Sequence, residues 1–420
     1  MSNLFDTYLT YVDRTESPLI FHRWSLLTCI GAQLGRKYWL PFGDFKIYSN
    51  MYVMLMGDPG TRKSSAIKLA KRLLSNTGYD HFSGDRTSKE KFLLDLEGVE
   101  DETGKVIDRN TVMNNLFGDD GIMGDPKEVF VCADEFNEFV GTGNLEFLSL
   151  LGSLWDWDDE SRPFKQRLKT SRSVSIYQPT ISILAGNTHA GFAEAFPPQA
   201  LGQGFLSRLV LVYGESSGKK IAFPEKPDEA LKARLVDQIG AIGTEVHGEA
   251  AISDKARGML TVIYNSFKGL DDARFKHYST RRFTHLLKLC LLCSASRLST
   301  EIGAEDVLLA NTLLSFVEHR MPQALGEFGK ARHADVASRI LAILNEATVP
   351  MGAAELWKQV SSDLDNMQEL NKLLINLAQA QKLQWFQAKG GGASGYLIKK
   401  KLLGNQQVYV DYSLLKESKS

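Results

Sequence analysis

The sequence predicts an α/β protein in which a parallel sheet with interleaved helices is followed by a helical region and a small C-terminal domain. Two observations lead to this fold class. Residues 45–56 are predicted to form one strand that ends in a short run of consecutive apolar residues, typical of strands buried on both faces. Such runs recur at residues 129–133, 180–185 and 209–213. Helical stretches separate these runs, and strands connected through helices pair in parallel.

The composition is that of an ordinary globular chain, and its 420 residues are enough for two or three domains. Lys+Arg 49 against Asp+Glu 50 excludes a histone-like polycation but leaves room for a local basic groove. Four cysteines are too few for a disulfide scaffold and suggest a reducing compartment. No apolar run approaches about 18 residues and no secretory signal opens the sequence, so we expect a cytoplasmic protein without a membrane span.

Three predicted regions precede the C-terminal domain. Residues 1–44 form an N-terminal helical segment, which could be a collar, an oligomerisation arm or part of the core. Residues 45–225 form the core that contains the sheet. In residues 226–328 the strand signals stop, and the apolar spacing predicts helices.

Residues 329–420 read as a separate small domain with a tail. Helical spacing is found at residues 336–344, 353–360 and 367–383, and a hairpin is expected from residues 384–386 and 396–399 around a glycine-rich turn. Three helices and a β-ribbon predict a winged helix–turn–helix, which serves either nucleic-acid binding or protein docking.

The segment GDPGTRKSS lies between a buried strand and a helix, which is the context of a phosphate-binding loop. Small residues let backbone N–H groups surround the phosphates, and the helix N-terminus adds its partial positive charge. Lys63 would reach the β- and γ-phosphates, and the Ser64 hydroxyl would bind Mg²⁺. The predicted nucleotide-binding residues are Gly57, Asp58, Pro59, Gly60, Thr61, Arg62, Lys63, Ser64 and Ser65.

Arg62 stands where such loops usually have a glycine. Its backbone N–H can still donate, but its side chain must then point away from the nucleotide. The plain alternative is a Gly/Ser turn that binds nothing.

Two further strands end in polar residues suited to hydrolysis. Residues 129–135 place Asp134, a candidate ligand of Mg²⁺, and Glu135, a candidate general base, at a strand end. Asn187 follows the next strand and could orient the attacking water or sense the γ-phosphate. Two solvated carboxylates and a simple Gly-Asn turn are the alternatives.

Arg208 immediately precedes the last core strand. An arginine there could reach the nucleotide of a neighbouring subunit and neutralise charge in the transition state. A surface salt bridge is the alternative.

The order of these motifs resembles that of AAA+ ATPases: phosphate loop, acidic strand end, sensor asparagine, then a finger arginine in a Leu-Ser-Arg context. The stretch STRRFTHLLKLCLLCSASRL, followed by AEDVLLANTLL, is similar to the lid of the minichromosome-maintenance helicases. On that match Arg281 takes the sensor-two role, with Arg282 as a close rival. A winged helix after the lid also fits that family.

The stretch IYSNMYVMLMGDPGTRKS is similar to a phage and prophage family of replicative helicases and primase-associated ATPases. Together the resemblances span residues 20–402. They imply ATP and Mg²⁺ as cofactors and a ring, expected to be a hexamer, with ATP bound between subunits. The DNA-binding N-terminal domain and the zinc site of minichromosome-maintenance proteins have no counterpart here.

Two basic segments are candidates for binding DNA, either single-stranded or forked. The first precedes the sensor strand, where AAA+ helicases carry a hairpin that projects into the ring pore; the second lies in the predicted wing. A solvated hairpin with scattered charge is the alternative for the first. The candidate residues are Lys165, Arg167, Lys169, Arg172, Lys399, Lys400 and Lys401.

Two other clusters are set aside as structural. Cys290 and Cys293 lie in a leucine-rich helix without a second ligand pair, which favours a core role over a metal site. The acidic run DWDDE, from Asp156 to Glu160, is more typical of a solvated turn than of a cation site.

The expected function is therefore an ATP-dependent DNA helicase or translocase for phage or mobile-element replication, working in the cytoplasm of a bacterial host. A loader or remodeller that hydrolyses ATP without unwinding, and a DNA-tethering module that binds nucleotide without turnover, remain alternatives. Replication proteins are possible partners of the winged helix.

Overall fold

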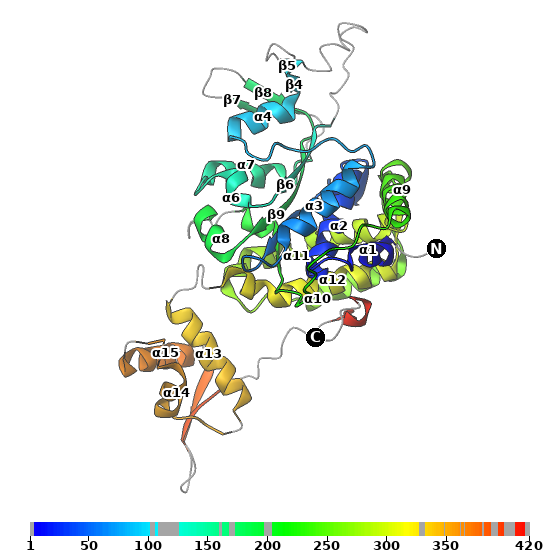
Figure 1. Cartoon of the computed structure of the whole chain (residues 1–420). Coiled ribbons are helices and arrows are strands. Elements are labelled where there is room, and N and C mark those ends of the chain that lie inside the picture. The colour runs from blue at the N-terminus through cyan, green and yellow to red at the C-terminus, as the bar shows by residue number, and fades with distance from the viewer. Residues whose placement is uncertain are drawn as a thin grey trace. The chain divides into compact units, whose positions relative to one another are not determined.

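The computed structural model describes residues 4–100, 106–107, 126–158, 162–167, 173–196, 204–326, 332–347, 349–361, 363–364, 366–379, 382–387, 394–398 and 408–415. The chain forms two compact units, one of residues 1–326 with 407–420 and the other of residues 327–406 (Figure 1). The helices and strands of each unit are described separately.

A four-stranded, all-parallel sheet forms the centre of the first unit, so the predicted α/β class with a parallel sheet is confirmed at this level. Its strand order is β10 (Leu209–Tyr213), β3 (Tyr52–Met56), β9 (Thr180–Asn187) and β6 (Glu128–Ala133). Strands β3 and β9 are buried along their whole length, which explains why their sequences read as continuous apolar runs.

The prediction of one strand over residues 45–56 is wrong. Strand β2 (Phe45–Tyr48) pairs antiparallel with β1 (Tyr38–Phe42), and β3 starts only at Tyr52. Polar side chains at the break take buried positions that a continuous strand would not allow. The Asn50 amide donates to the carbonyls of Trp155 and Ile181, and the Ser49 hydroxyl donates to the carbonyls of Gly31 and Gly35.

Helices cover both faces of the sheet (Figure 1). Helix α2 (Leu19–Leu34) and helix α3 (Lys63–Ser75) pack on one face, and α6 (Phe136–Val140) and α7 (Leu145–Leu154) pack on the other. Nearly every residue of α2 is buried, because α1 (Leu4–Val12), α9 (Glu229–Glu245) and α11 (Lys276–Ala295) cover it opposite the sheet.

The helical region after the sheet packs against the strand β10 side of the core. Helices α11 and α12 (Ala304–Leu325) lie against each other, and α12 contacts β10. The chain then returns to α12 after leaving for the second unit: the Asn311 amide donates to the carbonyls of Val408 and Tyr409, and the Tyr412 ring packs on Phe316.

The second unit has three helices and an antiparallel hairpin. Helices α13 (Arg332–Glu346), α14 (Ala353–Val360) and α15 (Met367–Gln379) surround a small core that includes Ile340, Leu356 and Leu370. Strands β14 (Leu383–Phe386) and β15 (Gly395–Ile398) form the hairpin.

The remaining elements are short, apart from α10. They are α4 (Lys89–Glu97), β4 (Val99–Glu100), β5 (Val106–Ile107), β7 (Phe164–Arg167), β8 (Ser173–Ile176), α8 (His189–Ala195), η2 (Leu206–Arg208), β11 (Gly248–Glu249), β12 (Ala251–Ile252), α10 (Asp254–Ser266), η3 (Ala273–Phe275), β13 (Glu301–Ile302) and η4 (Tyr412–Leu415). Among the helices that the structure describes, none is long and apolar enough to cross a bilayer.

Candidate functional site

The loop that follows β3 runs directly into α3, as the sequence predicts for residues 57–65. Gly57 is packed so tightly that a Cβ there would lie 2.5 Å from the carbonyl oxygen of Gly214, which only glycine avoids. Thr61 and Lys63 are buried, whereas Asp58, Pro59, Gly60, Arg62 and Ser65 are exposed and Ser64 is half-buried. The loop therefore presents an open outer surface over a fixed base.

Arg62 has a left-handed backbone conformation with φ 61°, and this explains why a glycine is usual at such a position. A non-glycine residue in this conformation costs about 1–2 kcal/mol. The backbone is fixed by the Ser17 hydroxyl, which donates to the Arg62 carbonyl at 2.8 Å. The Arg62 carbonyl is thus held in place although the residue has a left-handed backbone.

The Arg62 side chain points away from the loop, toward Glu16. Its Nε and Nη2 atoms lie 2.7 Å and 2.6 Å from Glu16 Oε2. The backbone N–H of Ile221 also donates to Glu16, and this hydrogen bond, followed by the one from Arg62, lowers the pKa of the Glu16 carboxyl. The guanidinium consequently leaves the phosphate-facing side of the loop open.

The Lys63 ammonium lies inside the loop. It donates to the carbonyls of Gly57 at 2.8 Å and Asp58 at 2.9 Å, and it is 3.2 Å from the Thr61 hydroxyl. Burial lowers its pKa, while the carboxylates of Asp58 and Glu135 oppose that shift. All three acceptors are neutral, so a phosphate oxygen would be a stronger acceptor for this ammonium.

The ends of three parallel strands bring the other predicted residues to the same place. Met56, which ends β3, is paired with Asn187 of β9, and β6 ends beside β9. A Cβ at Gly186 would lie 2.5 Å from the Asp134 carbonyl and 3.5 Å from Lys63 Cβ. The loop, both acids and Asn187 thus share the carboxyl edge of the sheet, the usual ligand site of open α/β sheets.

The Asn187 amide is the clearest sign of a missing acceptor at this edge. The side chain is 2% exposed, and its Oδ1 accepts from the backbone N–H of Thr188 at 2.9 Å. Its Nδ2, in contrast, has no hydrogen-bond partner among the described residues. Leaving a buried donor unpaired costs about 1–3 kcal/mol, so such a group is expected to meet a ligand or a water.

The residues present fit a magnesium ion bound together with phosphate. Ser64 offers a hydroxyl in the first turn of α3, and Asp134 offers a carboxylate; Mg²⁺ is usually held by one or two such groups plus phosphate oxygens. Asp134 forms an ion pair with Lys68 at 2.5 Å. Within the described residues, no three His, Cys, Asp or Glu side chains form a metal site by themselves.

Arg208 and Arg281 lie at the opposite, amino edge of the sheet. Arg208 precedes β10, which pairs with β3 so that Leu209 faces Tyr52. The loop begins at Gly57, five residues beyond Tyr52 and thus six beyond the level of Arg208. The separation along the strands is about 20 Å at 3.3 Å per residue, more than an arginine side chain spans. Neither arginine lies in the loop site of its own chain.

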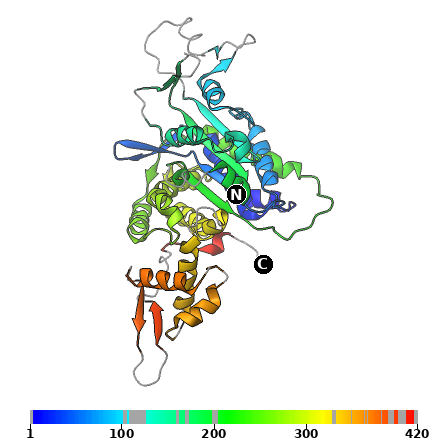
Figure 2. The same ribbon diagram turned by 90° about the vertical axis from the view of Figure 1, so that its left-hand side faces the viewer.

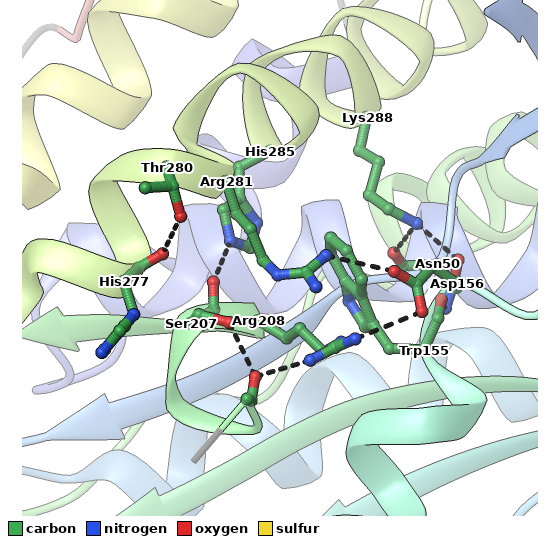
Figure 3. A network of polar contacts seen from close by, with 11 residues as sticks. Asn50, Trp155, Asp156, Ser207, Arg208, His277, Thr280, Arg281, His285 and Lys288 are labelled. Atoms are coloured by element: carbon green, nitrogen blue, oxygen red, sulfur yellow. Dashed lines mark hydrogen bonds and ion pairs between the residues drawn. The ribbon is translucent and has the colours of Figure 1, made fainter. Parts of the chain in front are cut away.

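One carboxylate joins these two arginines (Figure 3). Asp156 Oδ1 lies 3.4 Å from Arg208 Nη2, and Asp156 Oδ2 accepts from Arg281 Nη1 at 3.1 Å. Both guanidinium groups lie 5.8 Å from the centre of the Trp155 ring. The sequence does not link these residues, because 52 and 125 positions separate the arginines from Asp156.

Arg282, the rival for the sensor role, is a buried structural residue. Its guanidinium pairs with Glu318 at 2.9 Å and donates to the Asn311 side chain, which holds α11 to α12. Lys288, further along α11, donates to the carbonyls of Tyr48 and Asn50 and to the Asn50 side chain. Burial lowers the pKa of Lys288 to about 7.

Of the predicted DNA-binding residues, only two can be placed. Lys165 and Arg167 are exposed and two residues apart on β7, so they share one face of the β7–β8 hairpin, directly before β9. Lys169, Arg172, Lys399, Lys400 and Lys401 lie outside the described residues. Cys290 and Cys293 are fully buried in α11, and burial raises the pKa of both thiols.

Glu16, Lys68, Trp155 and Asp156 are site residues that the motif analysis does not identify. Only Asp156 carried a signal, as part of an acidic run that reads as a solvated turn. No protein-family model matches the chain, and no curated protein matches it either. The chemistry of the site therefore depends on its own geometry.

Proposed function

We propose that the chain is an ATP-hydrolysing motor of the AAA+ type, with the nucleotide held by residues 57–65. The observation that carries this proposal is the meeting of Lys63, Asp134, Glu135 and the Asn187 Nδ2, which has no partner among the described residues, at the carboxyl edge of the parallel sheet. A phosphate chain would give the Lys63 ammonium a charged acceptor in place of its neutral ones, and would give the Asn187 Nδ2 an acceptor.

Each residue has a defined task in hydrolysis. Lys63 exchanges its loop carbonyls for phosphate oxygens, and Asn187 donates to the γ-phosphate or to the attacking water. Glu135 accepts a proton from that water as its oxygen bonds to the γ-phosphorus, and the oxygen that bridges the β- and γ-phosphates leaves with ADP. Mg²⁺ held by Ser64 and Asp134 would neutralise charge on the phosphates.

Arg208 and Arg281 act on the nucleotide of a neighbouring copy. The strand register puts Arg208 about 20 Å from the loop of its own chain, beyond the reach of its side chain, and Arg281 shares the Asp156 carboxylate with it. An assembly in which the amino edge of one sheet faces the carboxyl edge of the next would repeat head to tail and close as a ring, for which we propose six subunits.

The polymer moved by this motor is proposed to be DNA, which makes the protein a helicase or translocase for phage or mobile-element replication. Lys165 and Arg167 present two exposed cations on a hairpin before β9, which suits contact with a phosphate backbone. The second unit, with its three helices and hairpin, fits a winged helix that would dock DNA or a replication protein.

ATP hydrolysis, measured with and without single-stranded DNA, tests the proposal. Lys63→Ala and Glu135→Gln should each lower DNA-stimulated turnover by at least about 100-fold, because the first removes the cation assigned to the phosphates and the second the base assigned to the attacking water. Lys255→Ala, an exposed lysine on α10, is the matched control and should leave turnover unchanged. Full activity in Lys63→Ala would refute the site.

A forked duplex then separates the motor from its alternatives. A helicase displaces a strand, and Lys165→Ala with Arg167→Ala should weaken displacement more than DNA-independent hydrolysis. A loader would hydrolyse ATP without displacement. A tether would bind ATP without releasing phosphate. Arg62 is the residue that suggests such an inactive loop, but its side chain points outward to Glu16, which argues against this alternative.

A further inference from the structure

Asp156 is the meeting point of two cations that come from different parts of the first unit. Arg208 precedes strand β10 of the core, and Arg281 lies on α11 of the helical region. Each guanidinium takes one carboxylate oxygen, at 3.4 Å and 3.1 Å (Figure 3). A single side chain thus holds both arginines that the proposed function assigns to a neighbouring nucleotide.

The cluster lies at the surface. The side chains of Asp156 and Arg281 are 45% and 33% exposed, whereas that of Arg208 is 12% exposed. Arg208 also donates to the Gly204 carbonyl at 2.7 Å, and its Nε has no hydrogen-bond partner among the described residues. The carboxylate can therefore be approached, and it leaves Arg208 incompletely paired.

The charges in the cluster favour an anion. Two guanidinium groups face one carboxylate, which leaves a net charge of about +1. Lys288 lies over the same Trp155 ring at 4.5 Å and adds a positive charge when protonated. Negative ligands are attracted to such a surface.

A phosphoryl group can replace the carboxylate without any new type of interaction. Both present paired oxygens to the planar fork of a guanidinium, and phosphate carries more negative charge. Partly exposed carboxylate–arginine pairs are weak because water screens them, so a triphosphate can displace them. Trp155 remains beneath both arginines and keeps them on the same side of the core.

We propose that Asp156 is a positioning residue that occupies Arg208 and Arg281 until the triphosphate of a neighbouring copy takes its place. This inference rests on the proposed function. Because one carboxylate releases both arginines, the core and the helical region engage the neighbouring nucleotide together. Asp156 thereby competes with the neighbouring nucleotide for both arginines and weakens the ATP-dependent association of neighbouring copies.

The test is Asp156→Asn in the full-length protein, which removes the charge and keeps the side-chain shape. We expect the KM for ATP to fall about three- to tenfold, the equivalent of two weak ion pairs. Association of the protein in the presence of a non-hydrolysable ATP analogue is measured by sedimentation. The protein concentration at half-maximal association should fall by a similar factor. A merely structural Asp156 predicts the opposite, since loosening the site would raise KM.

Three further variants fix the interpretation. Asp156→Glu keeps the carboxylate and should stay within about twofold of the parent, and Asp158→Asn is the control for a nearby charge. Asp156→Asn combined with Arg208→Ala should be as inactive as Arg208→Ala alone.

An unchanged or raised KM in Asp156→Asn, beside normal Lys63-dependent hydrolysis in the parent, would overturn the role of Asp156 and leave the proposed function standing. Absence of Lys63-dependent hydrolysis in the parent would instead count against the function itself.

Discussion

The two edges of the parallel sheet treat their cations differently. At the carboxyl edge, neutral oxygens accept from Lys63, and the Nδ2 of the buried Asn187 finds no acceptor in the part of the chain that the structure describes. At the amino edge, Arg208 and Arg281 share the carboxylate of Asp156. The first edge offers unsatisfied donor capacity to a ligand, whereas the second already pairs its arginines with a carboxylate. Under the function proposed above, one subunit therefore needs the arginines of a neighbouring copy to complete its ATPase site.

Substitutions of the two adjacent arginines on α11 should differ most in the free energy of unfolding. Arg282→Met leaves Glu318 buried without its partner and should lower the free energy of unfolding by about 3–5 kcal/mol. Arg281→Met breaks a partly exposed pair and should cost less than about 1 kcal/mol, while reducing ATP turnover. Urea unfolding of both variants measures the difference, and equal stabilities would contradict the assignment of Arg282 as structural.

Asn187→Asp should distinguish a role of Asn187 in ATP turnover from a role in folding. The aspartate still accepts from the Thr188 N–H but offers no donor and adds negative charge, so kcat should fall about 100-fold. Asn144→Asp is the control, because Asn144 caps α7 through an oxygen that aspartate also supplies. Steady-state kinetics and a melting curve are sufficient; turnover within threefold of the parent would remove Asn187 from the site.

Each edge also has a buried histidine. His22 lies within hydrogen-bond distance of the Thr15 hydroxyl near the loop, and His285 Nε2 pairs with the Ser207 carbonyl at the amino edge. Burial lowers the pKa of both to about 3. Between pH 3 and 6.5 the unfolded chain binds protons that the folded chain does not, so stability rises with pH across that window.

Acidification from pH 6.5 to 5.5 should therefore cost about 1 kcal/mol for each histidine. Urea unfolding at both pH values measures the loss. His285→Gln should remove about half of the histidine contribution to it, with His247→Gln, an exposed position, as the control. A loss as large in His285→Gln as in the parent would show that His285 is already protonated when folded.

Arg62→Gly should have the smallest effect. Glycine relieves the left-handed backbone but loses the exposed pair with Glu16 and adds freedom to the unfolded chain, so stability should change by less than about 1 kcal/mol. ATP turnover should stay within twofold. A tenfold gain in turnover would mean that Arg62 obstructs the loop after all.

The carboxyl edge could be predicted from sequence because each of its motifs is contiguous. A loop that wraps phosphate uses nine consecutive residues, and the acids directly end an apolar strand. The parallel strands themselves could be predicted because burial on both faces makes their sequences continuously apolar. The break at residues 49–51 was missed, since the polar side chains there are satisfied only by distant carbonyls such as that of Trp155.

The amino edge could not be predicted in the same way. Asp156, Arg208 and Arg281 are far apart in the chain, and nothing local distinguishes Asp156 from a solvated acid. Arg281 and Arg282 are neighbours, and only the helix rotation that buries one beside Glu318 tells them apart. Where three-dimensional packing decides between adjacent residues, sequence periodicity supplies no answer.

The return of residues 408–415 to α12 has a consequence for the second unit. The chain leaves the first unit after Leu325, at the end of this helix, and the returning segment is bonded to Asn311 and Thr312 of the same helix. Residues 327–406 are thus an insertion in the first unit, which continues on both sides of them: through α12 before, and through a segment hydrogen-bonded to α12 after. A deletion that joins Gly326 to Gln407 would excise the insertion while keeping the anchor that closes it.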